Sequence, residues 1–231
     1  MKPKNIIILC LLLAAAAGAQ EGWLVPFAAA YQPDVSGFNG LFRQNDLPEA
    51  RARHYGWGVE LRSLVGSGFL VGPLFFRTWD DVENDSFQLR TDATAILGEV
   101  GFRIAPFDFL TIVPMVGAGG LAENFNIRTK SPDMNLEELL RSPGQNATVS
   151  SGMKLAGMAA LEIGLSVGTT SGRYGLAARA GYLYSPLTVD WHLSNGARVT
   201  GAPTRHVGGP FFSLGILLLP AAQSTSTSSP Y

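Results

Sequence analysis

Residues 153–168 read MKLAGMAALEIGLSVG, and apolar and polar residues alternate along them. From Lys154 onward, the odd positions carry Leu, Gly, Ala, Leu, Ile, Leu and Val, and the even ones Lys, Ala, Met, Ala, Glu, Gly and Ser. A period of two indicates a β-strand with two unlike faces. A face in water is expected to be rich in Lys, Glu, Thr and Gln. The even face instead suits a crowded interior, and the odd face suits lipid.

The first 19 residues predict a secretory signal peptide. Lys2 and Lys4 precede an apolar run over 6–17, and Ala17-Gly18-Ala19 fits the cleavage rule, so the mature chain starts at Gln20. An apolar run of this length is too short to cross a hydrocarbon core of about 30 Å. The domain is expected to span 20–220, with no cysteine, and the polar segment 221–231 to form a disordered tail.

Seven further stretches have a strand-like pattern, with the least clear parity over 69–79. The eight expected strands cover 22–32, 54–64, 69–79, 86–104, 109–121, 153–168, 173–185 and 210–219. The two halves of 86–104 have opposite parity, which predicts a β-bulge near Ala95.

The connections between these strands alternate between long and short. They cover 33–53, 65–68, 80–85, 105–108, 122–152, 169–172 and 186–209, and the long ones hold most of the charged residues. This layout is typical of transmembrane barrels, which have tight turns at one end and large loops at the other. The sequence therefore predicts an all-β fold, an eight-stranded antiparallel up-and-down transmembrane β-barrel.

Charged residues on the sparse faces of these strands are expected to point into a narrow lumen and to pair there, because a buried unpaired charge is very unfavourable. The expected lumen charge network comprises Glu60, Arg62, Arg77, Glu99, Arg103, Lys154, Glu162 and Arg179.

Aromatic residues near the strand ends predict two interfacial girdles. The periplasmic girdle would hold Trp23, Phe107 and Phe109, and the outer one Tyr31, Tyr55, Trp57, Tyr182, Tyr184, Phe211 and Phe212.

With its strand pattern and the stretch PMVGAG at 114–119, the chain resembles the OmpA-like and OmpW-like small outer-membrane β-barrels of bacteria. The resemblance implies export to the outer membrane, contact with its lipid and with the barrel-assembly machinery, and a structural or surface-interaction role. An extracellular ligand or host surface is a further expected partner of the long loops.

Three other functions remain open. The OmpW-like alternative is a channel for small hydrophobic solutes, and a soluble lipocalin-like binder would carry its apolar faces inside. A lipid-modifying enzyme would need a base and a nucleophile on the rim, where His54, Asp85 and Ser86 fall. We expect no enzyme, cofactor or metal site, and no nucleic-acid partner, because acidic residues outnumber basic ones.

Overall fold

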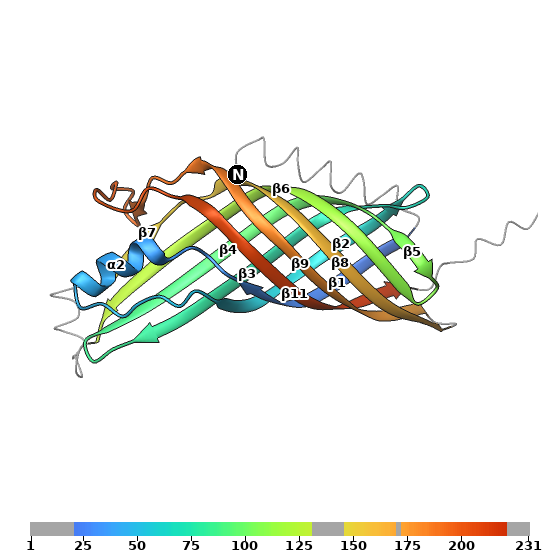
Figure 1. The fold of residues 1–231 in the computed structure, drawn as a ribbon, viewed down its shortest axis with the longest axis horizontal. Coiled ribbons are helices and arrows are strands. Elements are labelled where there is room, and N and C mark those ends of the chain that lie inside the picture. Colours follow the sequence, from blue (N-terminus) through green and yellow to red (C-terminus); the bar gives the residue numbers. More distant parts are fainter. Residues whose placement is uncertain (1–20, 131–145, 170–171, 221–231) are drawn as a thin grey trace, which may run out of the picture.

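Eight antiparallel strands close into a ring in the computed structural model (Figure 1). It describes residues 21–130, 146–169 and 172–220, so the expected signal peptide and tail lie outside the described residues. The ring strands are β1 (Glu21–Tyr31), β2 (His54–Val65), β3 (Phe69–Glu83), β4 (Phe87–Phe102), β6 (Leu110–Thr129), β8 (Lys154–Thr169), β9 (Gly172–Thr188) and β11 (His206–Pro220). Each pairs with its neighbours, and β11 closes the ring on β1. The predicted fold class is confirmed.

Four smaller elements lie at the two ends of the ring. β5 (Ile104–Phe107) pairs with β6 at the end of the ring that holds the 66–68 turn. At the opposite end lie α2 (Ser36–Gln44) and β7 (Asn146–Ser150), as Figure 1 shows. The short strand β10 (His192–Leu193) pairs with β7. Within the described ranges, no helix is both long and apolar enough to cross a membrane.

The predicted long connection at 80–85 is wrong, and the regular alternation of long and short connections fails there. β3 runs to Glu83 and β4 starts at Phe87, so residues 84–86 form a tight turn. Likewise β6 continues to Thr129, well beyond the predicted end at 121. Charges do not end a strand once it has left the lipid, because its outer face then meets water.

The predicted bulge near Ala95 is also wrong. The ladder between β3 and β4 stays in step from Phe69↔Phe102 to Glu83↔Gln88. The polarity of the two faces exchanges instead: Glu99 is buried inside and Val100 exposed outside, whereas further out Leu89 is buried inside and Arg90 faces outward. The barrel is therefore membrane-like around its inner half and resembles a soluble barrel in its outer half.

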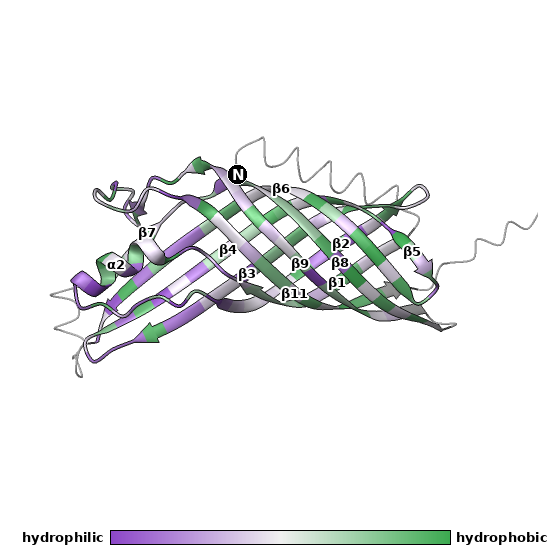
Figure 2. Cartoon of the chain, viewed as in Figure 1, coloured by the Kyte–Doolittle hydropathy of each residue, from purple (hydrophilic) through white to green (hydrophobic). Residues whose placement is uncertain are grey.

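An apolar band covers the outer wall around the inner half. Figure 2 shows hydrophobic strands toward the end with β5 and more hydrophilic ones toward α2. Exposed members of this band include Leu24, Leu61, Phe69, Ile96, Val100, Phe102, Val116, Leu161, Ile163, Leu165, Leu176, Leu214 and Ile216. Such a continuous apolar wall is what a lipid-facing surface requires.

Seven of the ten predicted girdle residues lie exposed on the outer wall: Tyr55, Trp57, Phe107, Phe109, Tyr182, Tyr184 and Phe212. The assignment of Trp23, Tyr31 and Phe211 to the girdles is wrong, because all three are buried inside the barrel.

The register explains the direction of β1. Trp23 lies opposite Arg62, and directly opposed residues of an antiparallel pair point to the same face. The space inside is made partly by glycine, since a Cβ at Gly58 would lie 2.2 Å from the Phe27 ring. Both faces of β1 are apolar, so alternation alone could not orient it.

Candidate functional site

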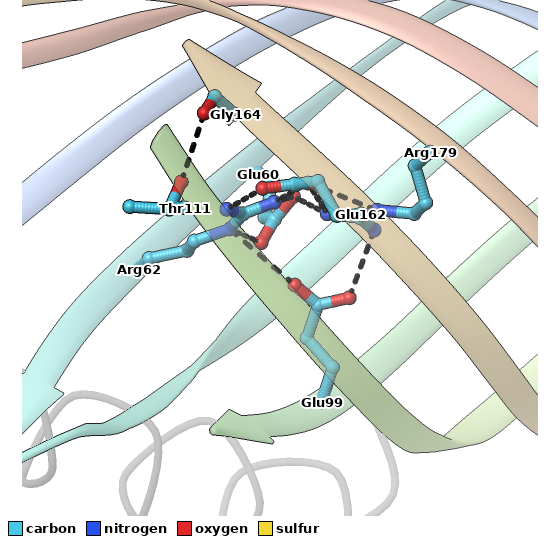
Figure 3. Close-up of polar contacts among 7 residues, drawn as sticks. All are labelled: Glu60, Arg62, Glu99, Thr111, Glu162, Gly164 and Arg179. Atoms are coloured by element: carbon cyan, nitrogen blue, oxygen red, sulfur yellow. Dashed lines mark hydrogen bonds and ion pairs between the residues drawn. The ribbon is translucent and has the colours of Figure 1, made fainter. Parts of the chain in front are cut away.

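Five charged side chains meet inside the inner half of the barrel (Figure 3). This inner charge cluster consists of Glu60, Arg62, Glu99, Glu162 and Arg179, each at most 4% exposed.

Arg179 from β9 contacts all three carboxylates of the cluster. It donates to Glu99 over 3.1 Å and to Glu162 over 3.0 Å, and it also bonds Glu60. Arg62 from β2 donates from Nη2 to Glu60 over 2.8 Å and from Nη1 to Glu162 over 2.6 Å. The two guanidiniums therefore tie four strands together across the lumen.

Strand register brings these residues into one layer. Glu162 and Arg179 are directly opposed on β8 and β9, and Glu60 and Arg62 share one face of β2. Glu99 has glycine on both sides, Gly72 on β3 and Gly117 on β6, which leaves room for its side chain.

The cluster has three carboxylates and only two guanidiniums. Glu99 has the weakest set of contacts: its Oε1 is buried with no hydrogen-bond partner, and Arg62 Nε lies 3.9 Å from it. Removing one partner from such a buried set exposes the rest to an uncompensated charge. The five side chains are therefore held mainly by bonds to one another inside the barrel.

The structure does not bring the other three predicted lumen residues into this cluster, and their assignment is corrected. Arg77 has a 48% exposed side chain that faces outward, 3.6 Å from Asp92. Arg103 follows the end of β4 and lies over the Trp23 ring, 5.8 Å from its centroid. Lys154 shares the inward face of β8 with Glu162 but is the first residue of the strand, at its outer end, whereas Glu162 lies near the middle. The alternation predicts on which face of a strand a residue lies, but not how far along the barrel axis it lies.

Aromatic side chains pack against one another in the outer half of the barrel. Phe38 and Phe42 project from α2 and are both buried. The centroid of the Phe38 ring lies 4.2 Å from that of Phe125 and 4.7 Å from that of Trp191. We call these four residues the outer plug. α2 was not predicted from the sequence, although Phe38 and Phe42 have the spacing of one helix face.

A buried charged group ties the outer plug to the wall. Tyr31 donates to Glu123 Oε1 over 2.7 Å, and Arg205 bonds Glu123 Oε2 and the carbonyl oxygen of Asp34. The Arg205 guanidinium also lies 5.4 Å from the centroid of the Trp191 ring. We call Tyr31, Glu123 and Arg205 the rim clamp. Glu123 and Arg205 fall in the expected connections 122–152 and 186–209, so the rim clamp was not predicted from the sequence.

The residues expected for a rim enzyme do not form a nucleophile and base pair. His54 is 2% exposed inside the barrel, with Nε2 2.9 Å from Thr91 Oγ1. Asp85 and Ser86 lie exposed in the 84–86 turn, which precedes the first residue of β4, Phe87. Thr91, the partner of His54, lies further along β4. Among the described residues, no group of three or more His, Cys, Asp or Glu side chains is placed to hold a metal ion.

Comparison with known proteins agrees with this architecture. No family model and no curated protein matches the chain. Among solved structures, Ail, the attachment invasion locus protein of Yersinia pestis, is similar with a TM-score of 0.51 and 14% identity over 86% of this chain and 97% of that one.

Two other solved barrels are similar at lower scores. Neisserial surface protein A aligns at 12% identity with a TM-score of 0.46, over 85% of this chain and 96% of that one. A major outer membrane protein of Thermus thermophilus aligns at 12% identity with a TM-score of 0.48, over 86% of this chain and 98% of that one. The likeness to the Yersinia protein shows the fold, so the predicted resemblance to small eight-stranded outer-membrane barrels is confirmed.

Proposed function

We propose that this protein is a closed barrel of the bacterial outer membrane, and that its role is to hold a structured outer surface for interaction with other molecules. The observation that carries the proposal is the packing of buried side chains inside the barrel at two levels, in the inner charge cluster and in the outer plug. From this packing we infer that the lumen is closed. An eight-stranded barrel has room inside for side chains and not for an aqueous channel.

The outer half supports a surface role. Its walls rise above the apolar band, and the rim clamp fixes α2 and the segment before β11 to them. Loops held on a rigid scaffold commonly carry binding. The name of the Yersinia protein describes attachment and invasion by that protein, and we propose a surface interaction here also.

The remaining expectations complete the proposal. The chain would be exported by a cleaved signal peptide, inserted by the barrel-assembly machinery and surrounded by outer-membrane lipid. It would act without enzymatic chemistry, and its partner would be an extracellular ligand or a host surface.

Surface labelling tests the orientation. Asp85→Cys places a thiol in the turn at the end with α2, and the matched variant Ser67→Cys places one in the 66–68 turn at the other end. On intact cells, a membrane-impermeant maleimide is expected to label Asp85→Cys and to leave Ser67→Cys unlabelled. The reverse pattern would overturn the proposed orientation.

Solute flux tests the closed lumen. Proteoliposomes of the folded barrel are expected to stay impermeable to small sugars and to small hydrophobic solutes alike. Uptake of hydrophobic solutes would favour the channel alternative and contradict the proposal.

A further inference from the structure

Two hollows adjoin on the outer wall, where β1 meets β11. The lower one, of about 260 Å³, lies in the apolar band between Tyr55 and Phe212, and Ala28 and Ala30 form its floor. The upper one, of about 460 Å³, is lined by Gln32, Pro33, Asp34, Val35, Ser36, Asn39, Ala52, Tyr182, Gly208, Gly209 and Pro210.

Register places the two hollows next to each other along the seam of β1 and β11. Ala30 pairs with Phe212 in the lower hollow, and two residues further on the Gln32 N–H donates to the Pro210 carbonyl in the upper one over 3.0 Å. Tyr182 lies opposite Pro210 and is 53% exposed at this junction. A Cβ at Gly209 would lie 2.1 Å from the Gln32 carbonyl oxygen, so glycine there permits the close approach of the two strands.

The chemistry changes from one hollow to the other. The lower hollow is apolar and faces the hydrocarbon of the membrane, whereas the upper one offers an amide, hydroxyls and the Asp34 carboxylate. Hydrogen bonds from the Ser36 hydroxyl and N–H hold the pKa of Asp34 below its usual range, so the charge is negative at neutral pH. The nearby Arg205 guanidinium is occupied by Glu123 and by the Asp34 carbonyl.

We propose that this seam binds one lipid selectively: an acyl chain lies on Ala28 and Ala30, and an uncharged, hydroxyl-rich headgroup lies in the upper hollow. The upper hollow has no cation in its lining to hold a phosphate, and its carboxylate would repel one. Sugar hydroxyls can both donate to Asp34 and accept from amide and phenol donors. The apolar wall of a second copy would leave these polar groups buried without partners, which is unfavourable.

Trp57 provides a direct readout, because it lies opposite Ala28 on the lipid-facing wall. The folded protein would be placed in phosphatidylcholine nanodiscs that contain a small fraction of a monoglucosyl diacylglycerol with dibrominated chains. Phosphatidylglycerol with the same chains serves as the comparison lipid. We expect the glucosyl lipid to quench tryptophan fluorescence at least two-fold more strongly than phosphatidylglycerol does. This excess quenching by the glucosyl lipid is expected to vanish in Trp57→Phe.

Three variants separate this site from general lipid contact. Ala30→Phe fills the lower hollow and is expected to abolish the excess, while Ala118→Phe, on the lipid-facing wall of β6, retains it. Tyr182→Phe removes one hydroxyl and is expected to reduce the preference for the glucosyl headgroup while general quenching persists. Gel mobility before and after boiling checks that each variant is folded.

Three results would overturn the proposal. One is equal quenching by both lipids in the wild-type protein, and another is an excess that survives in Ala30→Phe. The third is efficient formation of disulfide-linked dimers by Ala28→Cys in the same nanodiscs, which would show that a second copy of the protein covers the lower hollow.

Discussion

Replacing Arg179 by Met is the sharpest test of the inner charge cluster. Arg179 is 4% exposed and contacts Glu60, Glu99 and Glu162. Met keeps much of the length and the packing of the chain but removes the charge. Three carboxylates would then share the single guanidinium of Arg62 in a closed interior.

The magnitude follows from the burial of these contacts. Breaking a buried pair by removing one partner costs about 3–5 kcal/mol, because the remaining charge is left uncompensated. That is a large part of a typical unfolding free energy of about 5–15 kcal/mol. The matched variant Glu99→Gln leaves two carboxylates with two guanidiniums, and its amide oxygen can still accept from Arg179. We expect its unfolding free energy to change by less than about 1 kcal/mol.

The assay is equilibrium unfolding by urea in lipid vesicles, followed by tryptophan fluorescence and by the change in gel mobility on boiling. Unfolding of Arg179→Met at the same urea concentration as the wild-type protein would show that the buried carboxylates do not need Arg179. Equal destabilisation of Glu99→Gln and Arg179→Met would show that the excess of carboxylates over guanidiniums does not matter for stability.

Three further outcomes can be measured in the same system. Leu161→Arg places a charge on the lipid-facing wall and is expected to lower the unfolding free energy by about 2–4 kcal/mol in vesicles. The control Gln88→Arg, which faces outward above the apolar band, is expected to be tolerated. Similar losses of stability in the two variants would show that the position assigned to the apolar band is wrong. Phe38→Ala removes a ring from the outer plug and is expected to lower the unfolding free energy by about 3–5 kcal/mol. Leu41 on the same helix is exposed, so Leu41→Ala is expected to change the unfolding free energy little. Equal stability of the two variants would show that the outer plug does not pack. Arg205→Met is expected to speed protease cleavage of the outer loops in the folded barrel, because it removes the bonds to Glu123 and Asp34; an unchanged cleavage rate would contradict the rim clamp.

Much of the inner half could be predicted from sequence, because there the two faces of each strand differ in kind. The alternation over 153–168 identified Glu162 as inward and Leu161 as outward, and the structure places them so. On β1 both faces are apolar, and only the pairing of Trp23 with Arg62 decides which one is inside.

The outer half was harder to predict because its environment changes from lipid to water. Charges such as Asp81 and Glu83 lie on the outer face of β3, although in sequence they are typical of a loop. Glu123 and Arg205, which are 82 positions apart, meet only through the closure of the ring. No local pattern carries such a contact.

A spin-label scan of β8 tests the central claim, that the alternation over 153–168 separates lipid from a filled lumen. Each residue from 158 to 167 would be replaced in turn by cysteine carrying a nitroxide, in a barrel folded into vesicles. Oxygen accessibility is expected to alternate with a period of two, with maxima at Leu161, Ile163 and Leu165 and low values for both oxygen and a water-soluble nickel chelate at Glu162. Maxima at the even positions, or no alternation at all, would contradict the account.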